Sequence, residues 1–243
     1  MEKVVRPDGK AVSFAYDPLG RRVSKEFDGR ITKYLWDGNL ILHEWVEEIK
    51  ETPIEQSKEA KVFSWLSEDG AFTPIAKLTK ESAYSVISDH LGTPNTLLDQ
   101  NGEIVWKANF DIYGKPVIYA GERTGEETAH FHFTGRYHDL SSDSYYNQKL
   151  ENEDRLEINF IPFRFQGQYY DIETGLCYNR FRYYSPSDGI YTQINPIGLT
   201  GGNPTLYGYV SNPLIEIDPF GLNRMPSWMP TRQGYPRHHL IQL

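Results

Sequence analysis

The sequence predicts an all-β protein built as a strip of β-hairpins, and three observations carry this prediction. The 243 residues include 12 Phe, 5 Trp and 17 Tyr, which argues against a disordered chain because disordered chains are poor in aromatic residues. A short turn-forming pattern recurs along the sequence. Between its copies, apolar and polar residues alternate with the period of two that indicates strands. The length allows one large all-β domain or two ordinary ones.

The recurring pattern is an aromatic residue, then Asp, a few further residues and Gly. Asp can bond its own backbone two residues on, and Gly supplies a positive φ, so each copy predicts a turn. The copies begin at Tyr16, Trp36, Phe110, Tyr170 and, more loosely, Tyr184. Such repetition favours a solenoid-like sheet over the alternative, a generic β-sandwich.

Strands are predicted where the alternation is clearest, at residues 11–16, 31–36, 40–45, 84–88 and 104–110. Asn101-Gly102 lies just before the last of these and is a strong hairpin-turn signal. No stretch of ten residues has a convincing helical pattern. Two charged segments, 47–61 and 121–157, predict excursions on the surface.

The composition also excludes several classes of protein. The formal charge of −8 and the pI of about 5.4 repel phosphate backbones, so the core is not expected to bind nucleic acid. No run approaches 18 apolar residues, and the first ten residues contain no apolar export signal, so no membrane span is expected. The single Cys177 cannot form an internal disulfide.

The charge changes sign near the end of the chain. Residues 223–243 contain three Arg and no acidic residue, and this +3 segment leaves −11 for residues 1–222. A sharp change of this kind suggests two units joined end to end.

From about residue 84 onward the chain resembles the Rhs and YD-repeat family, above all its Rhs repeat-associated core. The motifs that carry the resemblance are DHLGTP at 89–94, FQGQYYD at 165–171, ETGL at 173–176, YNRFRYYSP at 178–186, PIGL at 196–199, GGNPTLYGYV at 201–210 and NPLIEIDPFGL at 212–222. The resemblance implies a strip that curls into part of a shell or spiral around a C-terminal toxin. It divides the chain into YD repeats with a charged insertion (1–83), the core (84–222) and an irregular tail that begins a toxin (223–243).

The resemblance also implies a self-cleavage site. In the family, a motif such as Pro213 to Leu222 ends the core, and many members cut themselves after its leucine. Pro219 and Gly221 belong to the same motif. The expected scissile bond is therefore Leu222–Asn223, which is where the charge changes sign.

Cleavage in the family resembles that of aspartic proteases, in which two carboxyl groups share one proton. Asp218 corresponds to one of the two, but Asn195 stands where the family has the other. Asn cannot ionise or hold an acidic proton. We therefore expect cleavage that is slow or absent, and at most an aspartic-protease-like activity.

The tail contains a second resemblance. His238 and His239, followed by two apolar residues, are similar to the opening of an HNH nuclease motif, although Gln242 stands where that motif usually has Pro. By that resemblance His239 is the general base and His238 lies on the metal side. The remaining ligands are absent from the sequence, so no nuclease activity is expected of this tail.

Other candidate residues have simpler interpretations. His130 and His132 would share one face of a strand, and His138 is near them in sequence. Histidines without a third ligand at diagnostic spacing are more often solvated or hydrogen-bonded than bound to a metal, so no metal or cofactor is expected. A basic, aromatic group could bind sugar or peptide, but cation–π packing is the preferred reading. Its members are Arg180, Arg182, Tyr183 and Tyr184.

Several functions therefore stay open. The leading one is the C-terminal segment of a toxin-delivery scaffold, made in the cytoplasm and delivered to competing bacteria by a contact-dependent system such as type VI secretion. Its partners by resemblance are the rest of the shell, the toxin and an immunity protein. The alternatives are an active autoprotease in which Asp188 or Glu216 replaces the missing acid, a β-module that binds carbohydrate or cell surfaces, and a truncated remnant.

Overall fold

The computed structural model describes residues 1–49, 60–115, 136–139, 144–147 and 161–223. These residues form sixteen strands and one 3₁₀ turn, η1 (Gly198–Gly201). The predicted all-β class is confirmed. No helix in this part of the chain has the length and apolar character that a membrane crossing requires.

The first ten strands form one antiparallel sheet in which each strand pairs with the next along the chain. Their order in space is thus their order in sequence, as expected for a strip of hairpins. The strands are β1 (Lys3–Val5), β2 (Ala11–Tyr16), β3 (Arg22–Phe27), β4 (Arg30–Asp37), β5 (Leu40–Glu48), β6 (Val62–Ser67), β7 (Pro74–Leu78), β8 (Ala83–Ser88), β9 (Pro94–Leu98) and β10 (Ile104–Lys107).

Two smaller sheets follow. A separate hairpin and a four-stranded antiparallel meander complete the described strands. The hairpin consists of β11 (Arg136–Asp139) and β12 (Ser144–Asn147), and the meander consists of β13 (Tyr169–Asp171), β14 (Leu176–Asn179), β15 (Arg182–Ser185) and β16 (Ile190–Tyr191).

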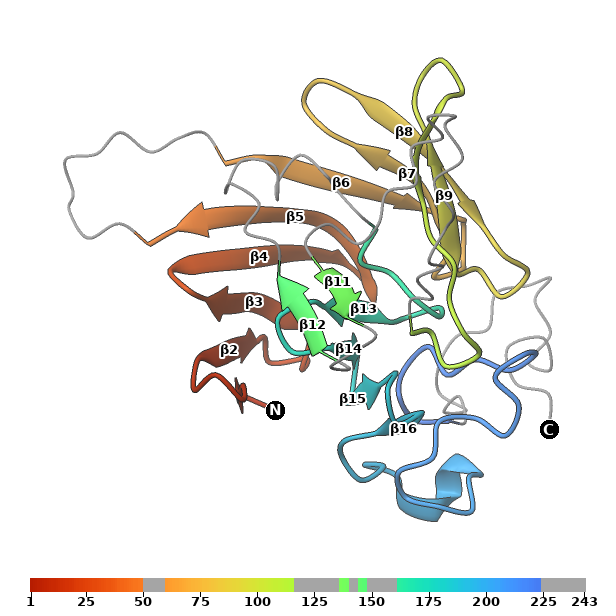
Figure 1. The fold of residues 1–243 in the computed structure, drawn as a ribbon. Helices are drawn as coiled ribbons and strands as arrows, with labels where there is room; N and C mark the ends of the chain where they lie inside the picture. Colours follow the sequence, from red (N-terminus) through yellow and green to blue (C-terminus); the bar gives the residue numbers. More distant parts are fainter. Residues whose placement is uncertain (50–59, 116–135, 140–143, 148–160, 224–243) are drawn as a thin grey trace.

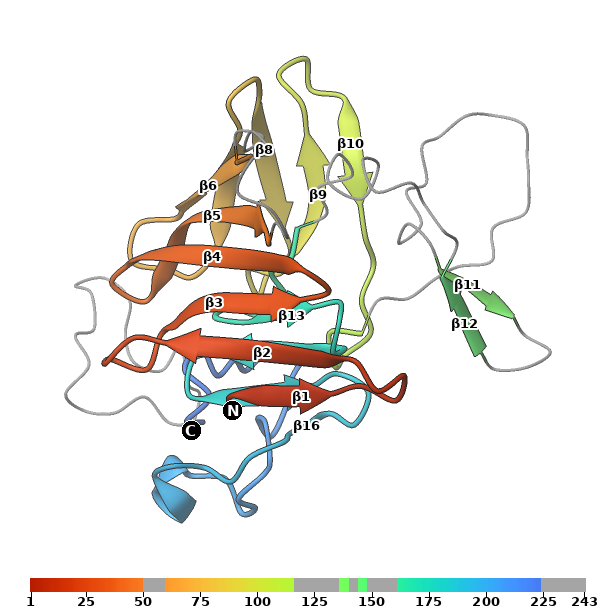
Figure 2. The same ribbon diagram turned by 90° about the vertical axis from the view of Figure 1, so that its left-hand side faces the viewer.

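The ten-stranded sheet is strongly curved, and the meander lies against its concave face (Figures 1 and 2). The core between them is made largely of aromatic side chains: Phe14, Tyr34, Trp65 and Trp106 project from the sheet and pack with residues of the C-terminal segment. From that segment come Ile161, Tyr169, Tyr178 and Tyr183. The strip therefore buries its inner face against the later part of the same chain.

Three of the predicted turns share one geometry, which a further turn at Asp89 also has. In four loops an Asp Oδ1 accepts hydrogen bonds from the backbone N–H groups two and four residues on, at 2.8 to 2.9 Å. The residue three positions on is always Gly, with φ between 75° and 85°, a region that favours Gly. The four acids are Asp17, Asp89, Asp99 and Asp111. Asn101-Gly102 thus lies inside a longer Asp-initiated turn rather than a two-residue hairpin turn.

Asp171 has the same pattern around it in the sequence but uses its carboxylate differently. It is fully buried and faces β3, where it pairs with Arg22 at 2.5 Å and Lys25 at 3.2 Å. Lys25 also pairs with Glu173 at 2.7 Å. The Arg22 guanidinium lies within 4.6 to 5.4 Å of the centres of four aromatic rings. These contacts join the N-terminal strip to the C-terminal meander.

The predicted strands are all present, but the strand predicted at 40–45 continues to Glu48. The last is shorter than predicted, because the chain leaves the ladder after Lys107. The first charged excursion begins later than predicted, since Glu47 and Glu48 belong to β5. Most of both excursions lies outside the described residues. The expected boundary between residues 83 and 84 falls at the start of β8, within the continuous sheet, and the division into domains stays a prediction.

Candidate functional site

Two copies of one short motif form the centre of the candidate site. Residues 195–199 read NPIGL and residues 218–222 read DPFGL. Each begins with Asn or Asp, whose carbonyl accepts the N–H of the Gly three residues on, at 2.9 Å for Gly198 and 3.3 Å for Gly221. Both glycines have positive φ, 61° and 68°. Both copies are therefore variants of the turn that closes the hairpins of the strip.

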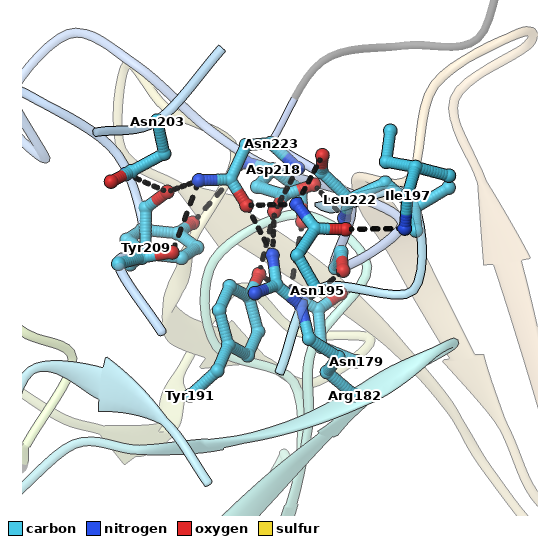
Figure 3. Close-up of polar contacts among 12 residues, drawn as sticks. Asn179, Arg182, Tyr191, Asn195, Ile197, Asn203, Tyr209, Asp218, Leu222 and Asn223 are labelled. Carbon is cyan, nitrogen blue, oxygen red and sulfur yellow. Dashed lines mark hydrogen bonds and ion pairs between the residues drawn. The ribbon is translucent and has the colours of Figure 1, made fainter. Parts of the chain in front are cut away.

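The two turns face each other across the peptide bond between Leu222 and Asn223 (Figure 3). The Asn195 side-chain amide donates to the Leu222 carbonyl oxygen at 3.1 Å. On the other side of that bond, the Asn223 backbone N–H donates to Asp218 Oδ2 at 2.6 Å. Asn195 and Asp218 are 4% and 2% exposed, so both atoms of this peptide unit are bound in a water-poor place by the two residues singled out from the sequence.

The orientation of the Asn195 amide follows from its own turn. Its Oδ1 accepts the backbone N–H of Ile197 at 3.1 Å, which leaves Nδ2 to face the Leu222 carbonyl. An Asp at position 195 would place its second oxygen against that carbonyl oxygen. Two such oxygens repel unless the carboxyl carries a proton, so Asn195 presents the donor that a protonated Asp would present.

Asp218 is surrounded by donors. Its Oδ1 accepts the Leu222 N–H at 2.9 Å, and its Oδ2 accepts the Tyr191 hydroxyl at 2.8 Å and the Arg182 guanidinium at 3.4 Å, in addition to Asn223. Burial raises the pKa of Asp218, and these hydrogen bonds and the guanidinium oppose the rise without cancelling it. The carboxyl group is therefore a more basic proton acceptor than an exposed Asp.

Tyr191 and Asn179 support Asp218 from β16 and the end of β14. The Asn179 amide donates to the Tyr191 hydroxyl at 2.8 Å and to the Asp218 carbonyl at 2.9 Å. Tyr191 and Asn179 are fully buried. The sequence contained no separate signal for these two residues, because Tyr191 is one of 17 Tyr and neither residue lies near Asp218 in sequence.

Arg182 on β15 contacts both sides of the junction. Its guanidinium donates to the Gly221 carbonyl and to Asn223 Oδ1, and it lies 3.5 Å above the centre of the Tyr191 ring. The cation–π packing predicted for this region is present at Arg182, and Arg180 likewise lies over Phe181 at 4.6 Å. The hydrogen bonds of Arg182 to the junction were not predicted, because residues 182 and 221 are far apart in sequence.

Residues of the N-terminal strip contact the second turn, 218–222, and the segment just before it. The Phe72 ring packs edge-on against Phe220, with ring centres 5.2 Å apart. His90 lies 2.9 Å from the Leu214 carbonyl, just after Pro213, where the terminal motif begins. A Cβ at Gly167 would overlap the backbone of Pro219, so these two loops are in close backbone contact.

The other predicted residues lie elsewhere. Asp188 bonds the Ser185 hydroxyl at 2.5 Å and Glu216 accepts the Asn212 N–H at 2.9 Å, so both carboxylates are occupied within their own loops. His238, His239, His130 and His132 lie outside the described residues, and His138 is described only as part of β11. Among the described side chains, no three His, Cys, Asp or Glu are grouped so as to hold a metal ion.

Comparison with known proteins shows the family of the chain. Residues 87–117 match the family model described as RHS protein. The probable deoxyribonuclease RhsA of Dickeya dadantii (strain 3937) is 31% identical over 226 residues, which is 91% of this chain and 13% of that protein. The chain belongs to the Rhs family.

A second Rhs relative and a solved structure extend the comparison. The double-stranded DNA deaminase toxin A of Burkholderia cenocepacia (strain H111) is 30% identical over 237 residues, covering 86% of this chain and 14% of that protein. The crystal structure of TcdB2-TccC3 without hypervariable C-terminal region matches 91% of this chain and 10% of that one, with a TM-score of 0.62 and 18% identity. The fold is thus shared, and this Rhs chain spans about an eighth of the length of the two curated relatives named above.

Proposed function

We propose that this Rhs chain is the C-terminal segment of a toxin-delivery scaffold. The scaffold ends at a self-cleavage site between Leu222 and Asn223, where cleavage is impaired and the peptide bond stays uncut. Two observations support the scaffold role: a relative named as a probable deoxyribonuclease and a relative named as a toxin each match most of the chain, and the fold is shared with a TccC3-containing structure. The proposed core, 84–222, closes the end of the strip, and the proposed tail begins at residue 223.

The observation that carries the cleavage proposal is the pair of contacts on one peptide bond. Asn195 binds the Leu222 carbonyl oxygen and Asp218 binds the Asn223 N–H. Hydrolysis of this bond needs a donor at the first atom, a base for the attacking water, and a proton for the leaving nitrogen.

The chemistry assigns these tasks unequally. Asp218 takes a proton from water as the oxygen adds to the Leu222 carbonyl carbon, and it returns that proton to the Asn223 nitrogen as the C–N bond breaks. The products are a carboxyl group on Leu222 and an amine on Asn223. Asn195 polarises the carbonyl as a donor but has no acidic proton to transfer to the oxygen. One half of the acid–base pair is therefore missing, and the loss of a positioned acid typically costs about 10²–10⁴ in rate.

Intact-mass measurement of the purified chain tests this. At neutral pH we expect the full-length mass to persist for hours, with no fragment that begins at Asn223. Asn195→Asp is expected to produce that fragment, and faster at mildly acidic pH, because the introduced carboxyl group must be protonated while Asp218 is ionised. Asn195→Asp combined with Asp218→Asn is the matched control and should stay whole.

Two results would overturn the proposal. Prompt cleavage of the parent chain after Leu222 would show that Asn195 does not impair the site. A correctly folded Asn195→Asp variant that stays whole between pH 4 and 8 would show that the geometry does not support hydrolysis.

The remaining features of the proposal concern the protein beyond the described residues. The tail 223–243 is the start of a toxin domain, and His238 and His239 would belong to its HNH-like opening. A full-length Rhs protein of this kind would be delivered by a contact-dependent route such as type VI secretion for competition between bacteria, and an immunity protein would neutralise its toxin. A pull-down with the products of neighbouring genes tests for that partner.

A further inference from the structure

We propose that the scaffold contains a subsite selective for asparagine at position 223, which fixes the first residue of the tail. The proposed cleavage reaction requires only that a peptide bond follow Leu222. The structure provides much more than that, because every polar group of the Asn223 side chain has partners on residues 182–209.

The amide nitrogen of Asn223 faces two backbone carbonyls. Its Nδ2 donates to the Gly208 oxygen at 3.0 Å and to the Tyr209 oxygen at 2.6 Å. Tyr209 is 3% exposed. A nitrogen with two hydrogens satisfies both acceptors, whereas an oxygen in the same place would repel them.

The amide oxygen of Asn223 faces two donors. Its Oδ1 accepts from the Arg182 guanidinium and from Asn195 Nδ2, the latter at 3.4 Å. Donors lie on one side of the subsite and acceptors on the other, so the subsite matches a carboxamide in a single orientation. A carboxylate would satisfy only the donor side. A methyl group would give the Gly208 and Tyr209 carbonyls no donor and a hydroxyl could donate to only one of them, which would leave Tyr209 with the Asn203 amide at 3.3 Å and Gly208 without this bond.

The backbone selects for the same residue. Asn223 has φ of 65°, in the left-handed region that Asn tolerates better than most other residues with a side chain. Gly would adopt this φ freely but would make none of the side-chain bonds. Asn therefore satisfies the backbone and the side-chain requirements together.

This subsite extends the proposed function to the far side of the scissile bond but does not depend on cleavage. In the intact chain it anchors the start of the tail. After hydrolysis, Asn223 would become an N-terminal residue whose ammonium group lies against Asp218, so the subsite would also hold the released end. The ligand class is a peptide that begins with asparagine.

The first test uses the uncut parent chain, with Asn223→Asp, Asn223→Ala and Asn223→Gly. Hydrogen exchange of the backbone amides of Leu222 and Asn223, which both donate to Asp218, is expected to accelerate about 10- to 100-fold in all three variants. Asn223→Asp should have the largest effect, since its second oxygen would face the Gly208 and Tyr209 carbonyls. Asn101→Asp makes the same chemical change in an exposed turn and should leave this exchange unchanged.

The second test places the same variants in the Asn195→Asp background. Cleavage is expected to slow by about tenfold or more when residue 223 is Asp or Ala. Unchanged exchange in the parent series would overturn the subsite even if Asn195→Asp cleaves. Conversely, accelerated exchange together with an uncleaved Asn195→Asp chain would support the subsite and reject the cleavage proposal.

Discussion

Asn195 differs from Asp in one side-chain atom, and this atom faces the Leu222 carbonyl. It occupies the same kind of Asx-Pro-x-Gly-Leu turn as Asp218, and the turn bond to Ile197 fixes which side-chain atom faces Leu222. The result is a donor aimed at the carbonyl oxygen without an exchangeable acidic proton. In the proposed reaction, the local fold that an acid would use is therefore retained, while Asn195 has no acidic proton to transfer.

A substitution at Gly201 would test the packing around the Asn195 side-chain amide. A Cβ at this position would meet the Leu222 carbonyl oxygen at 2.6 Å and would also touch the Asn195 amide. Gly201→Ala is expected to separate Asn195 from Leu222 and to destabilise the fold by about 1–3 kcal/mol, measured by urea unfolding. In the Asn195→Ala background the same change should cost less. Equal costs in both backgrounds would show that the two residues do not interact.

Lys77 is a buried cation for which a pH effect can be worked out. It is 1% exposed, its ammonium lies over the Phe63 and Trp65 rings, and burial lowers its pKa to about 8 from the ordinary 10.5. Below pH 8 Lys77 is charged in both the folded and the unfolded state, so its burial penalty is fully present. Between pH 8 and 10.5 the folded state loses its proton first, and stability rises.

Lys77→Met is therefore expected to stabilise the protein at pH 7, by at most about 3 kcal/mol, and to remove the rise above pH 8. Thermal unfolding from pH 6 to 10 measures both effects. Lys33→Met, at a half-exposed lysine, is the control and should change little. A loss of stability in Lys77→Met at pH 7 would show that the contacts of the ammonium outweigh its burial.

At the scale of elements, β3 and β13 are joined by charge rather than by backbone pairing. Asp171 of β13 is the shared partner of Arg22 and Lys25 of β3. All three side chains are buried, so removing the acid leaves cations that water cannot solvate. Asp171 balances both cations, and Glu173 helps only Lys25.

Asp171→Asn is expected to cost about 3–5 kcal/mol, because it breaks a buried ion pair on one side only. Urea unfolding followed by circular dichroism measures this cost. Asp99→Asn, in an exposed turn of the strip, should cost less than about 1 kcal/mol. If both substitutions had equal effects, the join between the strip and the meander would not depend on this carboxylate.

At the scale of the whole molecule, the C-terminal segment holds the curved sheet together and is held by it. The core cluster contains residues from β2 through β10 and from the segment that begins at Ile161. Ten strands paired only with their neighbours would otherwise leave the apolar inner face in water. Through Phe72 of the strip, which packs with Phe220 and Leu222, we expect the site at Leu222–Asn223 to be coupled to the stability of the strip.

Gly167→Ala tests this coupling. Its Cβ would overlap the Pro219 backbone, which should push the terminal motif away from the sheet. We expect one cooperative transition at a lower temperature, seen equally by circular dichroism and by the fluorescence of the tryptophans, of which Trp36, Trp45, Trp65 and Trp106 are in the strip. Gly102→Ala is a matched control, since Gly102 has nearly the same φ, 85° against 83°, but nothing within 4 Å. Separate transitions for the two signals would contradict the coupling.

Most strands and turns could be predicted from the sequence, because each depends on residues that are neighbours along the chain. Alternation of side chains predicts a strand, and Asp followed within a few residues by Gly predicts a turn, since the bonds involved span four residues or fewer. The importance of DPFGL and NPIGL, and of the Asn at the start of the second, came instead from the resemblance to the Rhs family. Local pattern overestimated the strand at 104–110, because only pairing decides where a ladder ends.

The contacts between distant strands and turns became known only from the three-dimensional fold. Asn195 binds the Leu222 carbonyl oxygen, and Arg182 binds Gly221 and the Asn223 side chain. Asp171 directs its carboxylate toward Arg22 in the core rather than into its own turn. All of these are contacts between residues far apart in sequence. Such contacts depend on the curvature of the sheet and on what fills its concave face. Local pattern sets the conformation of each turn, whereas burial against distant residues sets its charge state and its partners.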